Sequence, residues 1–73
     1  MSSEIPLAPL DRLIRNAGAS RVSLSAANAL RDVIEDVCDQ ITARAIELCE
    51  HAKRTTVTED DIRLAYKQWL AKR

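Results

Sequence analysis

The sequence has few of the residues that interrupt helices or fill a large core. It contains one glycine, two prolines, one tyrosine, one tryptophan and no phenylalanine. Alanine, leucine, isoleucine, valine and charged residues dominate instead, a composition typical of an all-α protein. With 73 residues, the chain forms at most one small domain, and a domain of this size needs a disulfide, a metal or a partner chain for stability.

The charges of the chain balance. Eleven basic and eleven acidic side chains give a formal net charge of zero, so any argument for a nucleic-acid partner must rest on where the charges lie. No apolar run approaches the ~18 residues of a membrane span. The opening segment MSSEIPLAPL also lacks the basic and apolar regions of a signal peptide. We therefore expect a soluble, intracellular protein with no membrane partner.

The two cysteines, Cys38 and Cys49, are eleven residues apart. If both lie on one helix, they share a face but are separated by about 16 Å. At that distance they can neither form a disulfide with each other nor share a metal ion. We expect both to be buried, reduced thiols. The stabilising element is then a partner chain.

Apolar residues recur at three- and four-residue spacing through most of the sequence, which predicts three helices. We expect a short helix over residues 6–17, a long helix from Leu24 to about Ala52, and a third helix from Thr58 to near the C-terminus. Residues 1–5 are expected to be a short flexible N-terminus. Residues 6–73 are expected to form a single domain.

The residues at the expected helix ends suit those positions. Gly18, the only glycine, follows the first helix, where glycine commonly ends helices. Ser23 is a candidate N-cap of the long helix. Thr58 and Asp61 have the spacing of a capping box, with aspartate in the position of the usual glutamate.

The long helix is too long for so small a domain. It would extend over about 43 Å, with an apolar stripe along its whole length that two short helices cannot cover. A second copy whose long helix crosses the first would cover it. We therefore predict an intertwined dimer, with Cys38 near the crossing point, where a small side chain is needed.

The two expected loops resemble each other. Arg21 precedes a valine and Ser23 in the first loop, and Arg54 lies upstream of a valine and Thr58 in the second. A helix N-terminus with a nearby arginine and hydroxyl groups suits a phosphate. In an intertwined antiparallel dimer, the first loop of one chain lies near the second loop of the other. This arrangement would suit successive phosphates along a DNA duplex.

The segments IPLAPLDRLIRNAGASRVS and EHAKRTTVTEDDIRLA place many residues in the order and spacing of a known family. On these segments, which span nearly the whole chain, the sequence resembles an archaeal histone, a minimal histone fold without tails. The resemblance implies an all-α histone fold, an obligate handshake dimer with itself or a histone paralogue, and binding of double-stranded DNA on the chromosome or nucleoid. Histones hold DNA by its backbone and deformability rather than by base sequence.

The resemblance also implies roles for individual residues. Arg21 would pair with Thr56 of a second chain beside the DNA, and Arg54 would bridge to Asp61 as a structural clamp within the chain. Leu48, His51 and Asp61 would form the contact between dimers that gives tetramers or longer assemblies. The residues expected to bind DNA are Arg12, Arg21, Lys53, Arg54, Thr55 and Thr56. The resemblance implies no catalytic residue, metal or cofactor.

Three residues depart from the family pattern. Lys53 stands where the family usually has glycine, Glu50 stands where a basic residue is common, and Asp11 adds an acid to the first helix. Since each lost phosphate contact weakens binding, we expect weaker, more salt-sensitive DNA binding than in a basic relative. The alternative is a dimerisation module that modulates chromatin assembly with a more basic paralogue and binds DNA weakly itself.

Other functions have little support in the sequence. A lone histidine such as His51 near the C-terminal end of a helix is ordinarily solvated and interacts favourably with the helix dipole. Only the resemblance favours an assembly contact for it. Tyr66 and Trp69 have the helical spacing of packing residues rather than of a base-stacking platform. The acids are dispersed and no nucleophile arrangement or glycine-rich phosphate loop is present, so we expect no enzyme.

Overall fold

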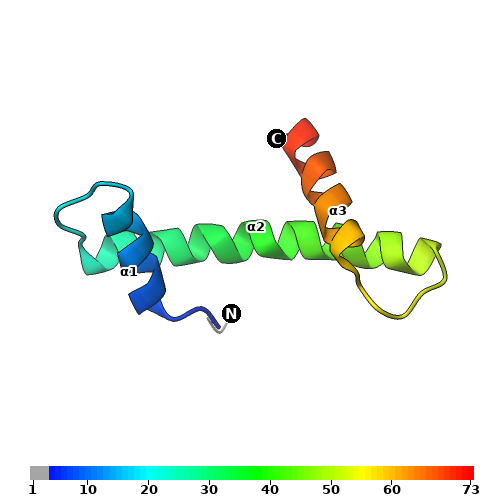
Figure 1. The fold of residues 1–73 in the computed structure, drawn as a ribbon, viewed down its shortest axis with the longest axis horizontal. Coiled ribbons are helices and arrows are strands. Elements are labelled where there is room, and N and C mark those ends of the chain that lie inside the picture. The colour runs from blue at the N-terminus through cyan, green and yellow to red at the C-terminus, as the bar shows by residue number, and fades with distance from the viewer. Residues whose placement is uncertain (1–3) are drawn as a thin grey trace. The chain divides into compact units, whose positions relative to one another are not determined.

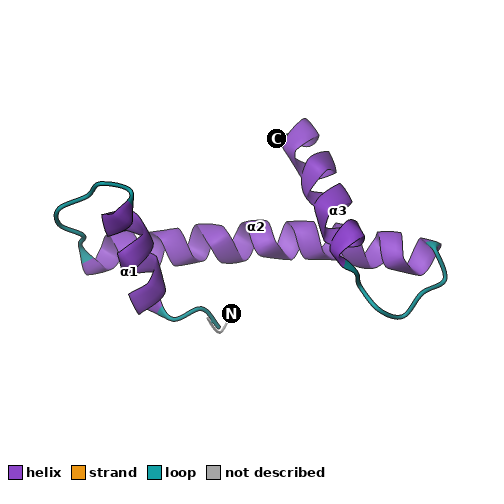
Figure 2. Cartoon of the chain, in the orientation of Figure 1, coloured by secondary structure: helices purple, strands orange, loops and turns teal. Residues whose placement is uncertain are grey.

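The computed structural model describes residues 4–73, which form three helices and no strand. The helices are α1 (Leu7–Asn16), α2 (Leu24–His51) and α3 (Glu59–Lys72) (Figures 1 and 2). The expected all-α order of short, long and short helix is confirmed. The expected ends differ from the observed ends by about one residue. Part of the expected flexible N-terminus, residues 1–3, lies outside the described residues.

The chain divides within α2, between Asp36 and Val37, into two compact units. The first unit contains α1 and the first half of α2, and the second contains the rest of α2 and α3. The division follows from the length of α2, whose 28 residues extend over about 42 Å. The expectation of a single domain over residues 6–73 stays a prediction.

In the first unit, α1 packs on the start of α2 through Leu10 and Ala27, both buried. Gly18 lies two residues past the end of α1 and has a φ of +124°. The N–H of Gly18 donates to the carbonyl of Arg15 at 3.0 Å, and the N–H of Ala19 donates to that of Ile14 at 3.4 Å. These two bonds satisfy carbonyls that the helix end leaves free.

In the second unit, α2 ends in the same way but without glycine. Lys53 has a φ of 59°. Its N–H donates to the carbonyl of Glu50 at 2.9 Å, and the N–H of Arg54 donates to that of Cys49 at 3.1 Å. A lysine therefore occupies a left-handed position that ordinarily favours glycine. The bond pattern explains how the helix terminates despite the substitution.

The predicted helix starts are confirmed. The Ser23 hydroxyl accepts a hydrogen bond from the N–H of Ala26 at 3.0 Å. At α3, the Thr58 hydroxyl accepts from the N–H of Asp61, while the Asp61 carboxylate accepts from the N–H of Thr58 at 2.9 Å, which completes the capping box.

The single chain has a small core. Among residues 4–73, the buried apolar residues are Leu10, Ala27, Ala45, Cys49 and Ala65, and no large side chain is fully buried. Cys49 is buried as expected, but Cys38 is exposed in the single chain, so the expectation of two buried thiols is wrong there. Midway along α2, nothing within the described part of the chain covers Cys38. No described helix is long and apolar enough to cross a membrane.

Candidate nucleic-acid interface

Two loops have matching construction. The first loop, residues 18–23, and the second loop, residues 53–58, each begin at a residue with positive φ and end at a hydroxyl N-cap. Thirty-five positions separate each residue of one loop from its counterpart in the other. Arg21 of the first loop therefore corresponds to Thr56 of the second, and both are exposed.

The first loop presents a cation beside the start of α2. Arg21 makes no hydrogen bond or ion pair with any described residue. The first turn of α2 contains no acidic residue, so the positive end of this long helix is not neutralised there. An arginine with free donors beside exposed helix N–H groups is a suitable site for a phosphate oxygen.

Arg12 of α1 lies near the same loop. It lines a cavity of about 370 Å³ together with Val22 and Ser23. Like Arg21, Arg12 is exposed and has no partner among the described residues. The structure therefore brings Arg12 and the first loop to the same part of the first unit.

The second loop is held to α2 by a thiol. The Cys49 sulfur donates to the carbonyl oxygens of Arg54 and Thr56, each at 3.2 Å. Lys53, Arg54 and Thr55 line a cavity of about 590 Å³ beside it. In contrast to α2, the first turn of α3 contains three acidic residues, which disfavour an anion at this helix start.

Arg54 and Asp61 form a two-pronged ion pair. The two terminal nitrogens of Arg54 donate to the two oxygens of Asp61 at 2.8 and 2.7 Å. One of them also donates to the carbonyl of Thr56 at 3.1 Å. The Asp61 side chain is only 5% exposed, against 40% for Arg54. The guanidinium therefore links the second loop to α3, and most of its N–H donors are not available to DNA.

The ion pair shifts the protonation equilibria of both groups. Hydrogen bonds from the Arg54 guanidinium, and then from the N–H of Thr58, hold the pKa of Asp61 well below its usual range. The hydrogen bond to Asp61 raises the pKa of Arg54. Asp61 is therefore a carboxylate at any pH near neutrality, and the pair stays ionised.

The residues expected at the contact between dimers differ in exposure. Leu48 is half-buried, His51 is exposed at the last position of α2, and Asp61 is buried. Within the chain, Asp61 is engaged by Arg54 and Thr58, and no described residue contacts His51 by a hydrogen bond or ion pair. Their assembly role stays a prediction. No group of three or more possible metal ligands occurs among residues 4–73.

Two residues that support the loops were not predicted from the sequence. Cys49 was expected only to pack, but it binds two loop carbonyls. Arg15 donates to Asp11 at 2.8 Å and to the carbonyl of Ser20 at 3.3 Å, which ties α1 to the first loop. The four-residue spacing of Asp11 and Arg15 is a recognisable helix pair, but nothing in the sequence predicts the contact with Ser20.

Comparison with known proteins identifies the family. The family model described as "Histone-like transcription factor (CBF/NF-Y) and archaeal histone" matches residues 3–66. The chain belongs to this family. It is 49% identical over 65 residues to one of the subunits of archaeal histone HAN1 from Thermococcus zilligii, a match that covers 89% of this chain and 97% of that relative. It is 35% identical over 65 residues, with the same coverage, to probable archaeal histone 3 of Methanocaldococcus jannaschii.

Family membership confirms the histone fold and the resemblance to archaeal histones. As a member of the family, the chain is a DNA-binding chromatin protein associated with the chromosome, and not an enzyme. The two loops described above are the parts of this histone-family chain with exposed cations beside helix starts.

Proposed function

We propose that the chain forms intertwined dimers that hold the backbone of double-stranded DNA between the first loop of one chain and the second loop of its partner. Further assembly into tetramers or longer arrays then wraps and compacts DNA in the nucleoid of the cytoplasm, with little sequence preference. The observation that carries this proposal is Arg21, which has no partner among residues 4–73 and lies beside the acid-free start of α2.

The exposed apolar surface supports the dimer. Leu24 is 71% exposed, Val33 58% and Tyr66 48%. Isolated exposed apolar residues are ordinary, but a chain with no large buried side chain among its described residues needs further apolar burial to be stable. A second copy of the long helix would bury the stripe that includes Val33.

The two loops contribute unequally to DNA binding. Arg12 and Arg21 have free donors near a helix start without acids, so they are the main DNA contacts in this proposal. Lys53, Thr55 and Thr56 add exposed donors on the second loop. Arg54 mainly supports that loop, because Asp61 and a loop carbonyl already occupy its terminal nitrogens.

A second candidate is a dimerisation module that modulates chromatin assembly with a more basic histone paralogue. Two observations favour it: the zero net charge of the chain, and the acids Glu59, Asp60 and Asp61 in the first turn of α3. In such a mixed dimer, the paralogue would provide most of the phosphate contacts.

A gel-shift titration of a ~60 base-pair duplex across a salt series separates the two candidates. We expect a shift that weakens steeply with salt, and weakened further by Arg21→Ala without loss of dimer stability. Lys67→Ala is the matched control, because Lys67 is an exposed cation on α3 outside both loops. A folded dimer that gives no shift even at low salt would refute the DNA-wrapping proposal and favour the module.

A further inference from the structure

One side of the α2–α3 pair carries a cleft lined by basic and amide side chains, here called the basic cleft. Its volume is about 360 Å³. Its charged lining residues are Arg44, Lys72 and Arg73, and no acidic residue lines it. None of these cations belongs to the two loops. The cleft therefore has a positively charged lining although the chain as a whole has no net charge.

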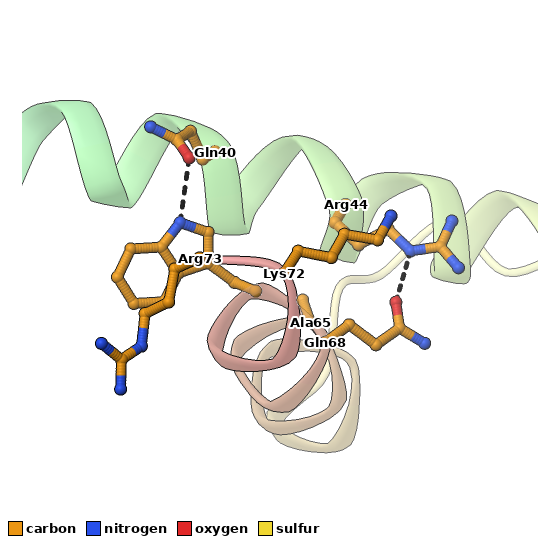
Figure 3. Close-up of a pocket in the computed structure, with 7 residues that line it drawn as sticks. Gln40, Arg44, Ala65, Gln68, Lys72 and Arg73 are labelled. Carbon is orange, nitrogen blue, oxygen red and sulfur yellow. Dashed lines mark hydrogen bonds between the residues drawn. The ribbon is translucent and has the colours of Figure 1, made fainter.

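The walls of the basic cleft are tied together across the two helices. The Nε of Arg44 donates to the Gln68 side chain at 2.6 Å, and the indole N–H of Trp69 donates to the Gln40 side chain at 2.9 Å (Figure 3). Because each bond joins α2 to α3, the cleft is formed before any ligand arrives. A preformed site loses less conformational freedom on binding.

The cations of the cleft are largely uncompensated. Glu47 contacts one terminal nitrogen of Arg44 at 3.3 Å. Lys72 and Arg73 make no side-chain hydrogen bond or ion pair with any described residue. Both offset the negative end of the α3 dipole, but Arg44 comes from α2 and that explanation does not extend to it. Three cations from two helices therefore meet around one opening.

A different face of α3 is suited to the partner chain. There Ile41, Ile62 and Tyr66, together with Glu59 and Arg63, line a mostly apolar cavity of about 500 Å³. In the proposed dimer, burial of this apolar surface by the partner chain would stabilise the complex. In this arrangement the basic cleft, with three cations in its lining, is left for a charged ligand.

On α3 the basic cleft is lined by the second half of the helix, together with Arg73, whereas the second loop precedes the start of α3 (Figure 1). The 14 residues of α3 extend over about 21 Å. Lys72 therefore lies too far from the second loop for one phosphate to contact both.

We propose that the basic cleft binds the phosphodiester backbone of a second DNA duplex, so that the assembled protein bridges two duplexes. The proposal rests on the DNA binding proposed above for the loops. Arginine, lysine and glutamine side chains are the usual donors to backbone phosphates. The cleft offers all three, with no acid in its lining to repel the phosphates.

A capture assay tests the bridge. Protein is bound to a bead-tethered duplex, and retention of a second, labelled duplex is measured. The test variant is Lys72→Gln with Arg73→Gln, and the control is Lys67→Gln, which removes an exposed cation from α3 outside the cleft. We expect the test variant to reduce capture about tenfold, because two phosphate contacts per chain are lost, while the control retains capture and both bind one duplex normally.

Trp69 gives an independent readout, since it is the only tryptophan and it lines the cleft. Its emission should change on duplex addition in wild type and in Arg21→Ala, and stay constant in the Lys72→Gln, Arg73→Gln variant. If wild type shifts one duplex but neither captures a second nor changes its emission, the bridge is refuted and the loop proposal stands. Loss of one-duplex binding in the test variant would place the cleft on the same duplex and overturn the bridge.

Two further outcomes are decisive. If wild type shifts no duplex, the loop proposal fails, and the bridge that rests on it fails with it. Emission that responds to poly-glutamate but not to duplex would assign the cleft to an acidic protein segment and also overturn the proposal.

Discussion

Lys53→Gly should stabilise the protein, because Lys53 holds a left-handed backbone conformation at the end of α2. That conformation costs a residue with a Cβ about 1–2 kcal/mol. Glycine removes this cost but adds about 0.5–1 kcal/mol of unfolded-state entropy. With the middle of each range, the net gain is about 0.75 kcal/mol per chain, and each 1 kcal/mol raises Tm by about 4–8 °C in a chain of this size.

The measurement is thermal unfolding at fixed protein concentration, since Tm of an associating protein depends on concentration. Lys53→Ala is the control, because it removes the same charge but keeps the Cβ. The order of Tm should be Gly above Ala. Equal values for the two variants would show that strain at Lys53 does not exceed the entropy cost of glycine and would refute the reasoning. The reciprocal change, Gly18→Ala, should lower Tm, because Gly18 has a φ of +124°.

Three other predictions follow from the caps, the ion pair and the assembly contact. Since the pKa of Asp61 is lowered on folding, its stabilisation is complete above its ordinary value near 3.8 and is lost as pH falls below it. The Tm difference between wild type and Asp61→Asn should therefore shrink between neutral pH and strong acid, and a constant difference would contradict the ion pair. Thr58→Ala should cost about 1 kcal/mol in urea unfolding; an unchanged midpoint would mean that the capping box does not stabilise α3. His51→Ala should still bind short DNA as a dimer but form fewer tetramers on cross-linking, and unchanged tetramers would exclude the interface role.

The helix order and helix starts could be predicted because their signals are local. Ser23 and Thr58 carry hydroxyls at the right distance from the backbone N–H groups they cap, and the three-four spacing of apolar residues follows from helix geometry alone. The residues recognised from the family pattern, such as Arg54 and Asp61, form their ion pair in the structure, but their wider roles depend on DNA and on a second chain.

The features that could not be predicted depend on how the chain folds back on itself. The left-handed conformation of Lys53 has no signal in the residue itself, because lysine rarely adopts it, and only the family's usual glycine at this position points to it. The thiol contacts of Cys49 require the second loop to return across the end of α2. The basic cleft was not predicted, because Arg44 and Lys72 are far apart in sequence and meet only when α3 packs on α2. Cys38 was misjudged because burial was inferred from an apolar stripe whose cover lies outside the single chain.

Because the single chain has a small core, the folded fraction of this protein depends on its total concentration in the cell. Under the proposed dimer, folding and pairing are one event, so at low concentration the folded fraction rises steeply with the total number of chains. Chains without a partner remain open to proteolysis, which removes the excess of any chain made out of proportion. DNA that stabilises the dimer lowers the concentration at which folding occurs. The amount of available DNA would thus limit the number of chains that stay folded and escape proteolysis.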